Sequence, residues 1–163
     1  MTFETRNIAA TPDAIAPDGS EVRLLGSLPQ GSMAAFRLPP NTVSKAVAHR
    51  TVVEIWYFTA GYGRIWRKLG DREAITGVAP GVSITIPTGT HFQFRCDGAE
   101  LLEAVAVTMP PWPGADEAYF VSGRWEPTVS HRTRVFRIAE PSANAYNPAA
   151  NAAMDRRKSW RTS

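Results

Sequence analysis

A histidine and a glutamate stand at the start of a strongly apolar, aromatic stretch of this sequence. His49 and Glu54 belong to HRTVVEIWYFTAG, which ends at Gly61. An unpaired carboxylate inside a protein is unfavourable by several kcal/mol, so Glu54 needs a cation, a hydrogen-bond network or a raised pKa. The stretch therefore predicts either a structural pair or the wall of a cavity where chemistry takes place.

A second histidine follows in the segment HFQFR. Side chains alternate across a strand, so His91 and Gln93 are expected on one face, and Phe92 and Phe94 on the other. If the polar face lines the interior of a barrel, His91 approaches Glu54.

Two imidazoles and one carboxylate are the ligands of the facial triad of non-haem Fe(II) enzymes, and Zn or Mn sites use them as well. Three protein ligands leave open positions for water or substrate. His49, Glu54 and His91 are therefore candidates for a metal site and for catalysis. Alternatively, His49 caps a turn and Glu54 pairs with an arginine such as Arg64 or Arg50.

Three further side chains are candidates for contact with a small-molecule substrate. Trp56 shares strand parity with Glu54, so its ring is expected to line the same interior. Gln93 shares parity with His91 and could orient a substrate or satisfy backbone groups. An inward-pointing Arg64 would favour an anionic substrate such as a carboxylate.

The elements that must position these groups are strands. From residue 21 onward, about eight short β-type runs alternate with turn residues, at the spacing of a sandwich or barrel. None of these runs shows a helical stripe with caps. Both faces of the run VVEIWYF are apolar, so we expect it to be covered on both sides. The fold class predicted is all-β.

The chain is expected to divide into four parts. Residues 1–20 form an N-terminal extension, 21–112 the barrel, 113–130 a segment that wraps over it, and 131–163 a basic, flexible tail. The prolines of TMPPWPG end the strand pattern, because proline cannot donate to a sheet ladder. The tail has little apolar surface to bury.

Composition and charge limit the partners. The chain has 163 residues, 44% hydrophobic and 20% charged, which suits one soluble domain. Residues 131–163 carry seven basic and two acidic groups, whereas residues 1–130 carry eleven basic and thirteen acidic groups. The basic groups of the tail are dispersed, with few aromatic residues to stack on bases, so we expect no nucleic-acid partner.

We expect a cytoplasmic protein without a membrane partner. No apolar run is long enough to span a bilayer. The N-terminus lacks the charged-then-apolar pattern of a signal peptide. The single cysteine, Cys96, cannot form an intrachain disulfide, which agrees with a reducing compartment.

The spacing around Glu54 resembles the first motif of the cupin superfamily. That motif has His-x-His, three or four residues, Glu, six residues and Gly. His49, Glu54 and Gly61 stand at this spacing, whereas the first histidine falls on Val47.

A second segment resembles the second cupin motif, which has Gly, five residues and then Pro-x-Gly-x-x-His. Gly81, Pro87 and Gly89 match it position by position. One residue fewer follows Gly89, so the histidine is His91, and Phe92 stands where the motif has its histidine.

The resemblance covers about residues 20–112. It implies a jelly-roll barrel with a central cavity and a divalent metal ion (Fe, Zn, Mn or Ni) held by His49, Glu54 and His91. Cupins include dioxygenases, isomerases, lyases and cyclases, and they commonly form dimers. We therefore expect a homodimeric, metal-dependent enzyme of oxygenase or lyase type that acts on a small organic molecule.

Two alternatives stay open. The chain could be a metal-free enzyme similar to the sugar epimerases of the same superfamily, in which a histidine acts as general base. The histidine missing at Val47 favours this alternative. The chain could also be a binding module that holds a small molecule without catalysis.

Overall fold

The structure, a computed structural model, describes residues 3–129, and these contain eleven strands and no helix. None of the described residues therefore forms a helix that could cross a membrane. The expected basic tail, 131–163, lies outside the described residues. The strands are β1 (Ala14–Ile15), β2 (Glu21–Leu28), β3 (Gly31–Leu38), β4 (Val47–His49), β5 (Val53–Ala60), β6 (Gly63–Leu69), β7 (Arg72–Val78), β8 (Ser83–Ile86), β9 (His91–Cys96), β10 (Leu102–Met109) and β11 (Ala118–Phe120).

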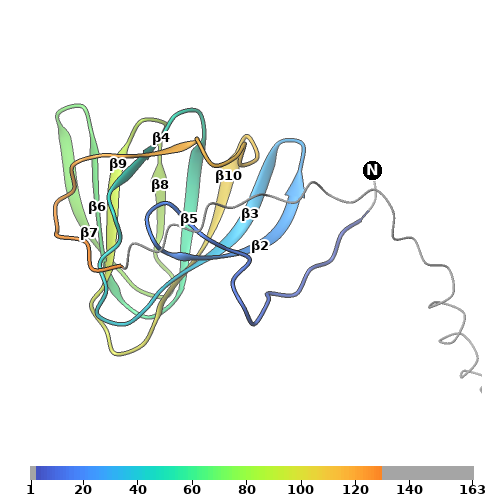
Figure 1. Ribbon diagram of the computed structural model, residues 1–163, viewed down its shortest axis with the longest axis horizontal. Coiled ribbons are helices and arrows are strands. Elements are labelled where there is room, and N and C mark those ends of the chain that lie inside the picture. Colours follow the sequence, from blue (N-terminus) through green and yellow to red (C-terminus); the bar gives the residue numbers. More distant parts are fainter. Residues whose placement is uncertain (1–2, 130–163) are drawn as a thin grey trace, which may run out of the picture.

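The strands form two antiparallel sheets. One has six strands in the order β1-β2-β3-β10-β5-β8, and the other has five in the order β11-β4-β9-β6-β7. β10 lies between β3 and β5, and β9 lies between β4 and β6, so the chain crosses repeatedly from one sheet to the other. Figure 1 shows β2 and β3 at one side of the molecule and β6 and β7 at the other. The predicted all-β jelly-roll class is confirmed.

The interior is built by strict alternation along β5. Glu54, Trp56 and Phe58 are buried, whereas Ile55 and Tyr57 on the opposite face are about half exposed (46% and 51%). The expectation that this strand is covered on both sides is therefore wrong for the single chain, because the side chains on its outer face remain about half exposed. The expected homodimer stays a prediction.

Small residues on β10 make room for the aromatic rings of β5. Ala106 lies opposite Trp56, and Ala104 lies opposite Phe58. The ring of Phe36 stacks on that of Trp56, with centroids 5.2 Å apart. The methyl groups on β10 leave space for these large rings, and close packing of this kind is typical of protein interiors. The core comprises Leu38, Val47, Trp56, Phe58, Ile65, Val78, Ile84, Ile86, Phe92, Phe94, Cys96, Leu102, Ala104 and Ala106.

The turn after β5 requires its glycines. Gly61 has a φ of 71°, and a Cβ there would lie 2.3 Å from the carbonyl oxygen of Leu101. A Cβ on Gly63 would lie 1.9 Å from the carbonyl oxygen of Arg95. The glycine of the first motif thus allows two backbone segments to approach closely.

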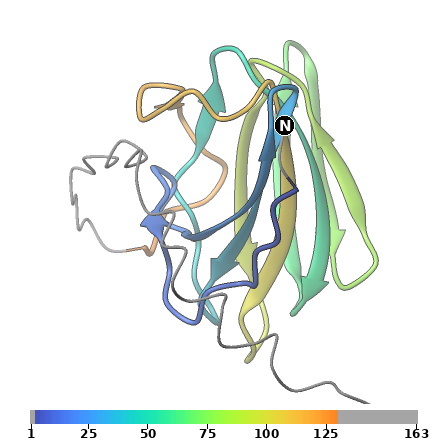
Figure 2. The ribbon, with the colours of Figure 1, turned by 90° about the vertical axis from the view of Figure 1, so that its right-hand side faces the viewer.

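Two irregular segments on the outside of the barrel each form several hydrogen bonds with one buried side chain. Near the N-terminus, Arg23 donates to the carbonyl groups of Ala9 and Ala10, and Figure 2 shows this segment (dark blue) on the β2 side. After β11, the amide oxygen of Gln93 accepts from the N–H groups of Arg124 and Trp125.

Gln93 is a structural residue in this fold. Its NH2 group also donates to the carbonyl groups of Ser44 and Trp125, and its side chain is fully buried. Replacing it with leucine would leave buried backbone groups without partners. We expect Gln93→Leu to lower the free energy of unfolding by about 3 kcal/mol in urea denaturation. Gln30→Leu, in the exposed β2–β3 turn, is the control, and an equal loss in both variants would contradict this role.

Candidate functional site

His49 ends the short strand β4 and points into the barrel. Val47, two residues earlier, pairs with Phe92 on β9, so Val47, His49 and Phe92 share the inner face. The imidazole makes edge-on contacts with the rings of Phe92 and Trp112, with centroids 5.2 and 5.1 Å away. Only 5% of His49 is exposed.

Glu54 lies beside this imidazole. On β5 it faces Thr108 of β10 on one side and Ile86 of β8 on the other. Its Oε2 accepts a 2.8 Å hydrogen bond from Nε1 of Trp56 and lies 3.7 Å from Nδ1 of His49. The latter distance is too long for a direct hydrogen bond.

The environment moves the two pKa values in opposite directions. Burial raises the pKa of Glu54 to about 7, the hydrogen bond from Trp56 opposes this rise, and the charges of Asp18 and Glu117 add to it. Burial lowers the pKa of His49 to about 4, with Glu117 acting in the opposite direction. Between these values both groups are neutral, so they do not form an ion pair.

The imidazole has an unused polar atom. Nδ1 of His49 is buried and has no hydrogen-bond partner among the described residues. Such an orphan group is unfavourable by about 1–3 kcal/mol. A polar atom placed between His49 and Glu54 would remove this penalty, so the pair is prepared to receive a hydrogen-bonding group.

Glu117 and Trp112 complete the site and were not predicted. Glu117 accepts from the backbone N–H groups of Thr51 and Val52 and from the Thr51 hydroxyl. Burial raises the pKa of Glu117, but these hydrogen bonds outweigh it and the pKa is lowered. Both residues come from the loop after β10, where no strand or helix period indicates which way a side chain points.

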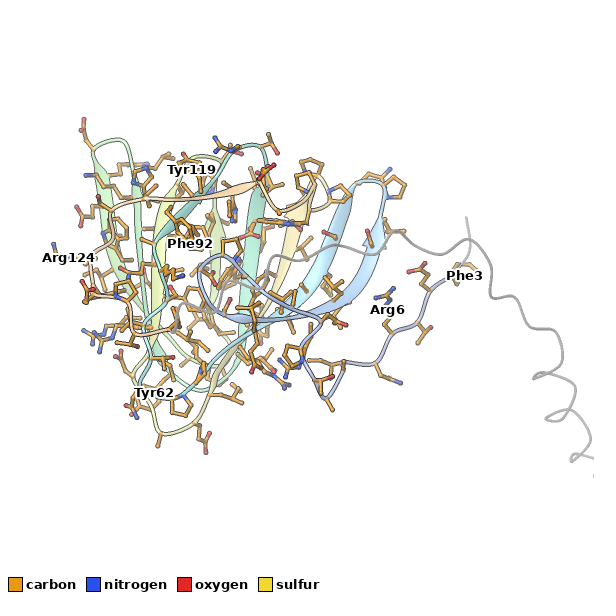
Figure 3. All side chains as sticks on the ribbon, in the orientation of Figure 1. Phe3, Arg6, Tyr62, Phe92, Tyr119 and Arg124 are labelled. Carbon is orange, nitrogen blue, oxygen red and sulfur yellow. The ribbon has the colours of Figure 1, made fainter. Side chains whose placement is uncertain are left out.

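His91 does not join the pair, and its expected position inside the barrel is wrong. On β9, Phe92 and Phe94 are the buried core residues, and His91 lies on the outer face opposite Lys68 of β6. Figure 3 shows Phe92 within the body of the barrel. Two phenyl rings gain far more from burial than imidazole and amide groups do, and this sets the parity of the strand.

Two of the three expected substrate contacts also lie outside. Gln93 faces outward with His91. Arg64 is exposed and bonds Asp97 at 2.8 Å, so it neither lines the interior nor pairs with Glu54. Trp56 does lie inside, beside Glu54, and its contact with a substrate stays a prediction.

Comparisons with known proteins address the fold. No family model matches the chain, and no curated protein is similar to it in sequence. A solved structure of the capsular polysaccharide assembling protein CapF from Staphylococcus aureus matches 66% of this chain at a TM-score of 0.57 and 16% identity. An uncharacterized conserved protein with a double-stranded β-helix domain from Klebsiella pneumoniae matches 73% of this chain at a TM-score of 0.53 and 12% identity. The chain has the cupin fold.

Cupin neighbours differ in length and include an enzyme. This chain spans 33% of CapF, 30% of oxalate decarboxylase from Bacillus subtilis and 91% of the Klebsiella protein. Oxalate decarboxylase matches 72% of this chain at a TM-score of 0.57 and 16% identity. At such identities the likeness shows the cupin fold alone.

The residues of this cupin barrel do not fit the expected metal ion. The four positions that correspond to the motif ligands hold Val47, His49, Glu54 and Phe92, and two of these side chains cannot coordinate. Within residues 3–129, no three or more His, Cys, Asp or Glu side chains are grouped to hold a metal ion. The expected site of His49, Glu54 and His91 is therefore not assembled.

The buried carboxyl predicts an unusual pH dependence of stability. Because the folded-state pKa of Glu54 is raised from 4.5 to about 7, its stabilising contribution is complete below pH 4.5 and is lost as pH rises through 7. From pH 4 to 8, the wild type should lose about 3 kcal/mol of unfolding free energy relative to Glu54→Gln, measured by urea denaturation.

Glu103→Gln is the matched control. Burial raises the pKa of Glu103, but hydrogen bonds from Thr59 and Arg37 outweigh it, so the pKa is lowered. The unfolding free energy of the wild type relative to Glu103→Gln should therefore rise, not fall, between pH 4 and 8. If Glu54→Gln and the wild type keep a constant difference across this range, Glu54 is not a buried neutral acid.

Proposed function

We propose that this cupin is a metal-independent enzyme of isomerase or epimerase type, in which His49 and Glu54 transfer protons to and from a small organic molecule. One observation carries the proposal. A neutral imidazole and a neutral carboxyl lie 3.7 Å apart with pKa values displaced in opposite directions. Two titratable groups whose environments separate their pKa values in this way are suited to act as base and acid.

The roles follow from the protonation states. Neutral His49 has an unpartnered Nδ1 that can take a proton from a substrate C–H or O–H group. Protonated Glu54 can deliver a proton to the neighbouring atom, while Nε1 of Trp56 holds its Oε2 in place. In the second half of the reaction, His49 returns a proton to a substrate carbon and the substrate hydroxyl returns its proton to Glu54, so both groups end in their starting states and the cycle consumes no proton.

Trp112 controls access to the pair. Its ring meets the imidazole of His49 edge-on, and 37% of the residue is exposed. The backbone N–H of Trp112 donates to the hydroxyl of Ser32 at 3.0 Å. A substrate must displace this ring, and its return would exclude water from the site.

The metal-dependent oxygenase or lyase is less well supported. With Fe, Zn, Mn or Ni, the interior would offer His49 and Glu54 as ligands, whereas catalytic metal sites commonly use three protein ligands. Val47 and Phe92 stand at the other two ligand positions, and their side chains lack donor atoms, which disfavours a metal-dependent reaction.

Isotope exchange tests the proposal without a known substrate. The full chain is incubated in D2O with a panel of small hydroxycarbonyl compounds and sugars, in the presence of a strong chelator. We expect deuterium at a carbon next to a carbonyl group in at least one compound, detected by NMR. His49→Ala and Glu54→Gln should each reduce the rate by at least about a hundredfold.

His91→Ala is the control, because His91 lies on the outer face, and its rate should equal that of the wild type. Exchange that the chelator abolishes would contradict the metal-independent proposal. Saturable binding of a compound without any exchange would instead support the alternative of a non-catalytic binding module.

A further inference from the structure

A groove of about 580 Å³ lies between the β6–β7 hairpin and the segment that links β8 to β9. Arg67, Lys68, Arg72, Thr85, Pro87 and Thr90 are among the residues that line it. The groove makes no use of the side chains of His49 or Glu54. Its polar groups are unusual in two respects.

Arg67 is a half-buried cation without a counter-ion in the described part of the chain. Its Nη1 donates to the carbonyl of Thr85 at 2.9 Å and its Nη2 to the hydroxyl of Thr76 at 3.2 Å. These bonds use two of the five N–H groups of a guanidinium. No carboxylate within residues 3–129 lies within 4.0 Å of it. Burial lowers the pKa of Arg67.

Thr90 contributes a hydroxyl that the fold does not use. Only 3% of the residue is exposed, and its Oγ1 has no hydrogen-bond partner in the described part of the chain. Its backbone N–H donates to the carbonyl of Pro87 in the turn before β9. A buried hydroxyl without a partner is rare in native proteins and calls for an explanation.

The surrounding charges favour an anion. Arg72 also lines the groove and lies on the same face of the β6–β7 hairpin as Arg67, whereas Lys68 and Glu73 pair opposite one another on the other face. Glu73 accepts a 2.7 Å hydrogen bond from Nε1 of Trp66 and lies 3.9 Å from Arg124. The groove therefore carries excess positive charge close to unused hydrogen-bond donors.

We propose that this groove binds the oxyanion group, phosphate or carboxylate, of a small molecule. The free N–H groups of Arg67 form a planar fork that matches two oxygens of such a group. The hydroxyl of Thr90 donates to the same group, which supplies its missing partner. This site is separate from the His49–Glu54 pair, so the anion-binding proposal can fail or succeed independently of the proposed proton transfer.

Calorimetry on the full chain tests the site with two probes, inorganic phosphate and malonate, with ionic strength held constant by NaCl. We expect saturable binding of at least one probe, and the preferred probe identifies the group. Arg67→Gln should weaken binding by at least about tenfold, because charge-assisted bonds are lost. Thr90→Val, which is nearly isosteric, should weaken it by a smaller factor.

Arg64→Gln is the matched control, because Arg64 is exposed and paired with Asp97 on the outer face, and its affinity should equal that of the wild type. Binding of neither probe overturns the proposal. Equal binding by the wild type, Arg67→Gln and Thr90→Val also overturns it, since the effect is then a general one of salt. If Arg67→Gln does not fold, as judged by circular dichroism, Thr90→Val decides the outcome.

Discussion

The site depends on one constraint, the burial of a carboxyl group among aromatic rings. Alternation along β5 brings Glu54 inside with Trp56 and Phe58, because all three share one face of the strand. The indole N–H of Trp56 is the hydrogen-bond donor that the interior offers to this carboxyl. Burial lowers the pKa of the neighbouring imidazole as well, although the charge of Glu117 opposes this shift. The neutral state of His49 therefore follows from the same burial.

The residues that depart from the cupin motifs have a common physical effect. Val47 and Phe92 replace two side chains that could coordinate a metal ion, and they also remove polar atoms from around His49 and Glu54. A less polar interior raises the pKa of a carboxyl and lowers that of an imidazole. The same two side chains that make the donor set unfit for a metal ion thus favour a pair of neutral groups. The loop after β10 adds to this effect, because Trp112 closes over the imidazole.

Much of the fold could be predicted from the sequence, because short alternating runs and turn residues report on local structure. The inward positions of His49, Glu54 and Trp56 follow from their place in the strands. The outward position of His91 was missed, because strand side chains repeat every two residues and a one-residue shift reverses the whole strand. The short turn after Gly89 was the available signal, and the phenyl rings on either side of Gln93 decided the parity.

Other parts of the site were beyond sequence reasoning. Glu117 reaches Thr51 and Val52 across sixty-six and sixty-five positions, and such long-range contacts leave no local pattern. The groove at Arg67 was missed for a similar reason. Its guanidinium comes from β6 and the hydroxyl of Thr90 from the turn before β9, and the long-range pairing of β6 with β9 brings them to one groove.

The most direct measurement is the pKa of Glu54 itself. The chain labelled with 13C at glutamate carboxyl groups is titrated by NMR, and the Glu54 resonance is assigned from its absence in Glu54→Gln. We predict a midpoint near the value of about 7 that burial imposes. A midpoint close to the ordinary value of 4.5 would mean that the carboxyl is charged at neutral pH, and the account of a neutral acid beside a neutral base would be wrong.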